Sequence, residues 1–239
     1  MIVQALITAW ERGQRLGPVE RGLILLQLAS PALADAQCAA VPIGERDRRL
    51  LALRASLFGE RLVGLVACPQ CGERLELEAT TAELTCPPAD VDLRLARRGY
   101  ELDLRLPDST DLRASSVATT DPAAAARALI ARCIVSARRG DTAVDAGELP
   151  AAVLEDAAER IAAADPQADV QLALSCAACA APCRAPFDIV SFMWTELEAL
   201  AERLLWEVHT LAQAYGWSEP EVLALGPARR EAYLRMVLA

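Results

Sequence analysis

Two short cysteine motifs decide the fold of this chain: Cys68-Pro69-Gln70-Cys71-Gly72 and, far downstream, Cys176-Ala177-Ala178-Cys179. Residues 68–73 are called the first knuckle below, and residues 176–181 the second knuckle. Each Cys-x-x-Cys places two sulfurs on one side of a tight turn, and two such turns complete a tetrahedral four-thiolate zinc site. The sequence therefore predicts a structural zinc ion held by Cys68, Cys71, Cys176 and Cys179.

The second motif is the weaker signal. Gly72 lets the chain leave the first turn without a Cβ clash, but alanine follows Cys179. Cys183 also lies close by, which makes it an alternative fourth ligand. The segment 72–175 is much longer than the roughly 15–20 residues of a compact zinc ribbon, so the metal would be a long-range clasp.

Other roles for these cysteines remain open. They could be ordinary buried thiols or a redox pair, since free cysteine is often simply core. A catalytic zinc would need histidine or carboxylate ligands and an open position, and the chain has one histidine, His209. Cys38 and Cys133 stand alone in helical patterns, and we expect them in the core.

Composition limits the classes of function. The chain has 239 residues, of which 54% are hydrophobic, and a net charge of −9. No run approaches the roughly 18 apolar residues of a membrane span, and the start lacks the pattern of a secretory signal. We therefore expect a soluble protein made in the cytoplasm, whose eight cysteines bind metal or stay reduced. The acidic balance argues against general affinity for nucleic acid.

Helical periodicity marks both ends of the chain. Apolar residues recur at spacings of three and four near residues 2–12, 18–30 and 45–58, with a short helical turn at 33–39. The longest periodic segment, 193–215, ends at Gly216. Such a stripe usually packs within its own protomer, although it could also seat a partner helix. Ser218-Glu219-Pro220-Glu221 is a capping box, and Pro227 opens the last helix.

The middle of the chain alternates between apolar and polar residues, as strands do. We expect strands at 62–66, 74–78, 100–106 and 170–174, with an edge strand at Leu84-Thr85 and helices opening at Asp121-Pro122 and Pro150. The predicted fold is α+β, in which N- and C-terminal helices pack around a small antiparallel sheet carrying the zinc-ribbon-like four-cysteine site. Its parts would be a helical layer (1–60), a zinc-stapled sheet region with inserted helices (61–186) and a C-terminal helical segment (187–239), together one compact unit.

No catalytic constellation is visible. His209 lies mid-helix, with the neighbouring Glu207 on another face, and no nucleophile sits in a recognisable elbow or loop. The chain also lacks lysine, which excludes the usual phosphate-binding loop. We therefore expect a protein that is not an enzyme and has no small-molecule substrate.

Four parts of the chain together resemble phage-tail and contractile-injection-system baseplate proteins, of the family related to the hub and hub-assembly proteins of T-even phages. The first three are Leu50–Gly59, the first knuckle with Leu75-Glu76-Leu77, and Phe187–Trp194. The fourth, and the most specific, is the tail that runs from Glu207-Val208-His209 through Tyr215-Gly216-Trp217-Ser218-Glu219 to Tyr233-Leu234.

The resemblance implies a structural component or an assembly factor of the baseplate of a contractile phage tail or a tail-like injection particle. Its partners would be other baseplate or hub proteins, and it would occupy the bacterial cytoplasm during assembly and then the particle. Trp206, Trp217 and Tyr233 would be the contact residues, because interface hot spots favour Trp and Tyr. The alternative is a zinc-ribbon adaptor or transcription-related regulator, which predicts a basic face near the knuckles.

Overall fold

The computed structural model describes residues 2–238, and the chain folds into two compact units. One unit joins the segment up to Leu28 with the segment from Val190 onward, and the other is Ala29–Ile189. The ranges predicted from composition follow the order of the chain, whereas the two ends of the chain here share one unit.

The unit formed by the chain ends is helical. It is built from α1 (Ile2–Gly13), α2 (Pro18–Ala29), α9 (Ile189–Tyr215), α10 (Glu219–Ala224) and α11 (Pro227–Leu238). Trp194 of α9 packs so closely on Gly13 of α1 that a Cβ there would overlap the indole, and the Arg21 guanidinium lies over the same ring, 4.6 Å from its centroid. Much of the apolar stripe of α9 is buried. Its buried members are Met193, Leu197, Ala201, Leu204 and Leu211.

The second unit contains the remaining helices. They are α3 (Asp35–Ala39), α4 (Ile43–Phe58), α5 (Thr81–Leu84), α6 (Ser109–Ala118), α7 (Pro122–Arg132) and α8 (Ala151–Ala164), with 3-10 turns η1 (Ala146–Glu148) and η2 (Pro166–Asp169). Asp121 caps α7 by accepting from the backbone N–H groups of Ala123 and Ala124, as its position before a proline predicted.

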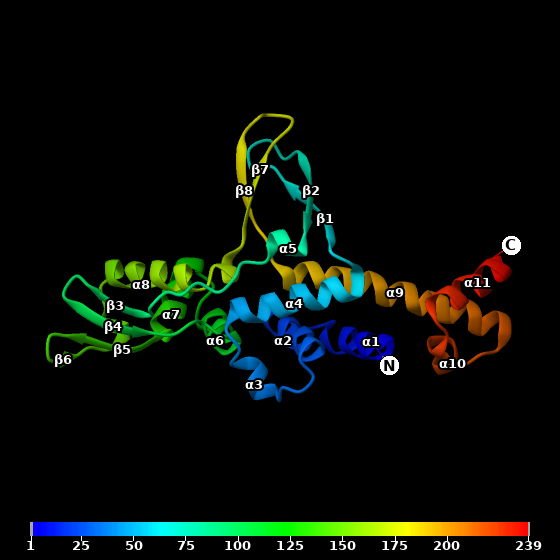
Figure 1. Ribbon diagram of the computed structural model, residues 1–239, viewed down its shortest axis with the longest axis horizontal. Helices are drawn as coiled ribbons and strands as arrows, with labels where there is room; N and C mark the ends of the chain where they lie inside the picture. Colours follow the sequence, from blue (N-terminus) through cyan, green and yellow to red (C-terminus); the bar gives the residue numbers. More distant parts are fainter. Residues whose placement is uncertain (1, 239) are drawn as a thin grey trace. The chain divides into compact units, whose positions relative to one another are not determined.

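The strands of the second unit form three separate antiparallel sheets. A first hairpin pairs β1 (Arg61–Ala67) with β2 (Arg74–Thr80), and a second pairs β7 (Gln171–Ser175) with β8 (Pro182–Pro186). Figure 1 shows the two hairpins side by side, with α5 at their foot. The third sheet has the order β3-β4-β5-β6, with bounds Arg94–Arg97, Tyr100–Leu104, Ile134–Arg139 and Thr142–Ala143.

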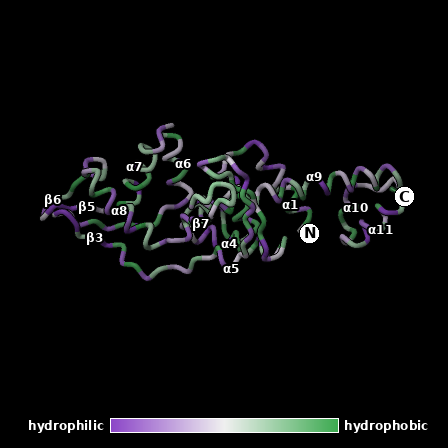
Figure 2. The backbone as a smooth tube through the Cα atoms, turned by 90° about the horizontal axis from the view of Figure 1, so that it is seen from above, coloured by the Kyte–Doolittle hydropathy of each residue, from purple (hydrophilic) through white to green (hydrophobic). Residues whose placement is uncertain are grey.

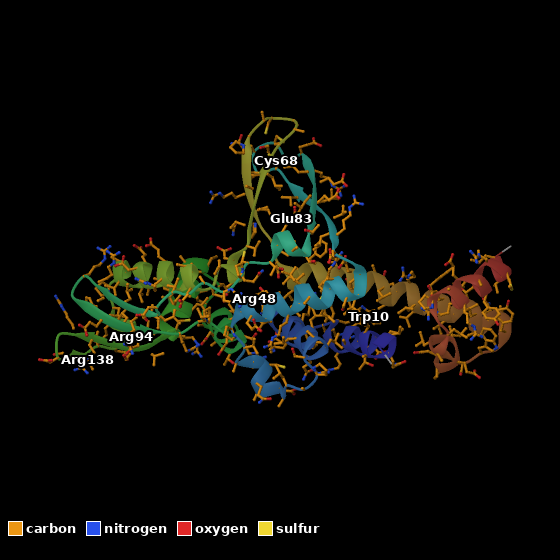
Figure 3. All side chains as sticks on the ribbon, in the orientation of Figure 1. Trp10, Arg48, Cys68, Glu83, Arg94 and Arg138 are labelled. Atoms are coloured by element: carbon orange, nitrogen blue, oxygen red, sulfur yellow. The ribbon has the colours of Figure 1, made fainter. Side chains whose placement is uncertain are left out.

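One face of the four-stranded sheet is buried against α7 and α8. The shared core is apolar and includes Leu95, Leu102, Leu104, Cys133, Ala137, Val153, Ala157 and Ile161. The residues around β3 and β6 are mostly hydrophilic (Figure 2), and Arg94 and Arg138 lie at this end of the sheet (Figure 3).

The α+β class is confirmed, and so is the position of both knuckles at the ends of strands. The single sheet predicted from the alternating segments is instead divided into three. The predicted edge strand at Leu84-Thr85 is wrong: residues 81–84 form α5, because Thr80 and Glu83 make a capping box that starts a helix. Strands β3, β5, β6 and β8 and helix α6 were not expected.

Candidate metal centre

The first knuckle is a tight turn that joins β1 to β2. The backbone N–H of Cys68 donates to the carbonyl of Glu73 (2.8 Å), and the N–H of Gly72 donates to the carbonyl of Cys68 (2.9 Å). Gly72 has φ +75°, a left-handed conformation that glycine adopts without steric cost. The pairing of β1 with β2 therefore places the two cysteines in the turn that connects these strands.

The second knuckle repeats this geometry. The N–H of Cys176 donates to the carbonyl of Ala181 (3.0 Å), and the N–H of Ala180 donates to the carbonyl of Cys176 (2.9 Å). Ala180 takes the place of Gly72 and has φ +58°, although it carries a Cβ. Alanine in place of glycine therefore does not prevent the turn from forming, but it strains the backbone at Ala180.

The four predicted ligands come together in space. Their sulfurs all lie within 4.8 Å of one another, with Cys68 Sγ 3.8 Å from Cys179 Sγ and Cys71 Sγ 3.6 Å from Cys176 Sγ. A tetrahedral zinc ion with Zn–S bonds of about 2.3 Å separates its sulfurs by roughly 3.8 Å. A disulfide would need about 2.05 Å, and all eight cysteines are free. The group can therefore hold a metal ion, and Figure 3 labels Cys68 near the end of the hairpins.

Backbone N–H groups already point at these sulfurs. Those of Cys71 and Gln70 lower the pKa of Cys68 to about 7. The N–H of Glu73 acts in the same direction on Cys71, but hydrogen bonding to the Cys176 thiol and partial desolvation of the sulfur outweigh it and raise the pKa of Cys71 to about 12. The N–H of Ala181 lowers the pKa of Cys179, but hydrogen bonding to Cys176 and partial desolvation of the sulfur outweigh it, so this pKa is also raised. The sulfurs thus compete for protons that a bound cation would displace.

Cys183, the alternative fourth ligand, is not a member of the four-sulfur group. It lies in β8 opposite Leu174 and belongs to a small apolar cluster with Cys68, Leu75 and Cys176. Cys38 and Cys133 are buried, as expected, and burial raises the pKa of Cys133 to about 11.

The feet of the hairpins are anchored on α4. Arg54, which is 3% exposed, donates from Nη1 to the carbonyls of Gly59 and Arg61 at 2.7 Å each and so fixes the entry to β1. Gln167 of η2 accepts from the N–H of Cys86 (2.6 Å) and donates to the carbonyl of Leu84 (3.2 Å), which fixes the chain after α5. The contacts of Gln167 join segments that lie far apart in the sequence, so no local pattern revealed them.

A buried carboxylate caps α4 from a distance. Asp165 Oδ2 accepts from the N–H of Gly44 (2.8 Å), and its Oδ1 lies 3.5 Å from Arg48 Nη1. Pro42, the N-terminal flanking residue of α4, makes no side-chain cap, so Asp165 supplies the acceptor that the helix start lacks. The second hairpin therefore begins from a segment already fixed to α4.

The predicted contact residues differ in their surroundings. Trp217 and Tyr233 are half-buried, with ring centroids 4.9 Å apart, and Tyr215 stacks on Trp217 at 4.7 Å. Trp217 and Tyr233 pack on a small core of Leu211, Val222 and Leu234. Trp206 is 49% exposed and lies outside this core. His209 is exposed on α9.

A family model described as T4 bacteriophage base plate protein matches residues 26–194, more than half of the chain. The chain belongs to this family. No curated protein and no solved structure matches it. The matched range contains three of the four resembling parts and both knuckles, but not the tail from Glu207 to Leu234 that had the most specific resemblance. The baseplate family is thus identified mainly by the unit that carries the hairpins.

Proposed function

We propose that this chain is a structural component of the baseplate of a contractile phage tail or tail-like injection particle, with no catalytic role, and that a zinc ion clasps its two hairpins. The match to the baseplate family over residues 26–194 carries the first part of the proposal. Membership of that family supports a role in binding neighbouring baseplate or hub subunits. Among residues 2–238, no helix combines the length and hydropathy of a membrane span.

The four thiols support zinc as the metal. The ligand group contains only sulfur, and four thiolates in a tetrahedral arrangement favour Zn²⁺ or an iron–sulfur centre. Four protein ligands leave no open position, which is typical of structural rather than catalytic zinc. We propose Cys179 rather than Cys183 as the fourth ligand, because its sulfur lies in the group.

The hairpins have a physical need for such a clasp. Each is a separate two-stranded sheet, and an isolated two-stranded hairpin is at best marginally stable in water. Apart from the sulfurs, the cluster between the hairpins contains only Leu75 and Leu174 among its described members. A metal held by both knuckles would therefore contribute directly to folding of this part of the chain.

For the partner surface we propose Trp206 as the contact residue. Its side chain is 49% exposed and lies on α9, in the unit formed by the chain ends. Trp217 and Tyr233 would act indirectly, by holding α10 and α11 against the end of α9.

The alternative role as a nucleic-acid-binding regulator predicts a basic face near the knuckles. The hairpins carry Arg61, Arg74 and Arg184, but Glu73, Glu76 and Glu78 belong to the same hairpin as the first two. Glu78 is also paired with Arg61, at 2.6 Å. This balance does not give the clustered positive charge that phosphate binding requires.

Purification of assembled particles tests the proposed role. Particles from cells expressing a tagged chain should contain this chain in a fixed ratio to the tube and sheath subunits, and it should stay bound after a high-salt wash. Particles that assemble fully but contain none of the chain would contradict a structural role and favour an assembly factor. Failure of particles to assemble without the chain, with normal particles upon re-expression, would support either form of participation.

A further inference from the structure

The sulfurs at the knuckles face each other in pairs that cross from one hairpin to the other. Cys68 faces Cys179, and Cys71 faces Cys176. We propose that these thiols are also a site of oxidative cross-linking, in which disulfides Cys68–Cys179 and Cys71–Cys176 join the hairpins covalently. This inference rests on the proposed function in so far as it concerns the same four thiols as the metal clasp.

Each facing pair combines one exposed and one buried cysteine. Cys179 and Cys71 are exposed, while their respective partners Cys68 and Cys176 are each 2% exposed. An oxidant in solution therefore reaches one sulfur of each pair, and the buried sulfur is held against it, shielded from competing reactions. The two pairs use each of the four sulfurs once, so both bonds can form in the same molecule.

The backbone favours bonds across the hairpins over bonds within a knuckle. Closing a facing pair requires the sulfurs to approach from 3.8 or 3.6 Å to about 2.05 Å. The hairpins belong to separate sheets, so they can shift toward each other without losing a ladder hydrogen bond. Closing a pair within one knuckle would instead distort a turn that two backbone hydrogen bonds fix, such as those of Cys68 and Gly72.

With hydrogen peroxide as oxidant, the chemistry is balanced within each pair. The exposed thiol gives up its proton as its sulfur attacks one peroxide oxygen, the O–O bond breaks, and the released hydroxide takes up that proton to become water, leaving a sulfenic acid. The sulfur of the facing thiol then attacks this sulfur, the S–S bond forms and the S–O bond breaks, and the leaving hydroxide takes up the proton of the facing thiol as a second water. Two thiols and one peroxide thus give one disulfide and two waters.

The hairpins could therefore be joined in two ways, by a metal ion under reducing conditions and by disulfides under oxidising conditions. In a reducing cytoplasm the thiols stay free or bind metal, and in an oxidising medium outside the cell they can be locked. A particle that leaves the cell makes this transition once. The cross-links would then close the chain over residues 68–179 in place of the metal, because the same four sulfurs cannot form disulfides and bind a metal ion at once.

The test uses the full-length, metal-free protein treated with hydrogen peroxide, then blocked at its remaining thiols and digested with trypsin without reduction. Trypsin leaves Cys68 and Cys71 together in peptide 62–74, and Cys176, Cys179 and Cys183 together in peptide 161–184. We expect these two peptides to be recovered as one linked species. Fragmentation should assign Cys68 to Cys179 and Cys71 to Cys176. On a non-reducing denaturing gel the oxidised chain should migrate faster, because a long loop is closed.

Recovery of the two peptides unlinked, each with an internal disulfide or with only blocked thiols, would overturn the inference, and so would linkage only through Cys183. The double variant Cys176→Ser/Cys179→Ser is the control, since Cys68 and Cys71 can still pair but the change in mobility should be lost. Zinc binding is measured separately on the reduced protein. Zinc binding without cross-linking overturns this inference alone, whereas cross-linking without zinc binding overturns the proposed clasp alone.

Discussion

The second knuckle makes a quantitative prediction about backbone strain. Ala180 has φ +58°, while Gly72 has φ +75° at the equivalent position of the first knuckle. A left-handed conformation costs an L-residue about 1–2 kcal/mol, and glycine loses about 0.5–1 kcal/mol more than alanine in backbone entropy on folding. Ala180→Gly should therefore raise the free energy of unfolding by about 0.5–1 kcal/mol.

The reverse substitution provides the matching test. Gly72→Ala should lower the free energy of unfolding by about the same 0.5–1 kcal/mol, because nothing lies within 4 Å of a Cβ at this position and only backbone conformation changes. Ala178→Gly is the control: Ala178 is also exposed and in the second knuckle but is not among the residues with positive φ, so this change should destabilise.

Urea unfolding followed by far-ultraviolet circular dichroism measures all three variants against the parent at fixed metal concentration. We expect Ala180→Gly and Ala178→Gly to move the midpoint in opposite directions. If Ala180→Gly lowers the midpoint as much as Ala178→Gly does, the two knuckles are not equivalent and the strain at Ala180 is not real.

Three further predictions concern the rest of the molecule. Gly44→Ala should lower the free energy of unfolding by about 1–3 kcal/mol or more, because the new Cβ would overlap the carboxylate of Asp165 that caps α4. Gly226→Ala is the control and should change the urea midpoint little, because open space surrounds this position. Burial alone would raise the pKa of Asp111, but hydrogen bonds from Arg105, the N–H of Asp108 and Arg132 hold it below its ordinary value. Its stabilising contribution is therefore present above pH about 4 and lost as the pH falls further. Asp111→Asn should cost about 1.5–3 kcal/mol at pH 7 and flatten the acid end of the stability profile, and equal losses at all pH values would contradict the assignment. Trp206→Ala should leave the free energy of unfolding within about 0.5 kcal/mol of the parent and yet reduce incorporation into particles. Trp217→Ala should instead lower the free energy of unfolding by about 3 kcal/mol or more. Normal incorporation of Trp206→Ala would exclude Trp206 as the contact residue.

The sequence was informative where the determining contacts are local. The spacing of the cysteines and the alternation of Leu75 and Leu77 around them predict both the knuckle and its place between strands. Asp121, Pro122 and the capping box at Ser218 likewise predict helix starts, because a cap acts over three residues. The α+β class follows from these segments together.

What the sequence could not predict depends on partners distant along the chain. Strand β8 begins and ends with proline and contains Cys183, Arg184 and Ala185, so pairing with β7 rather than strand propensity forms it. Asp165 caps α4 from 121 residues further along the chain, and no sequence pattern near Gly44 predicts this contact. Ala180 had one usable signal, its equivalence to Gly72, which indicates a left-handed residue despite its side chain.

The metal content of the purified protein tests the central claim most directly. Wild-type protein prepared without added chelator should contain an equimolar amount of zinc, and removing the zinc should lower its thermal midpoint. Cys71→Ser should lose the zinc and the metal-dependent stability, whereas Cys86→Ser, at a half-exposed cysteine outside the group, should retain both. A wild-type protein that is free of metal, takes up none when zinc is supplied under reducing conditions, and is as stable as any metal-treated sample would contradict the clasp.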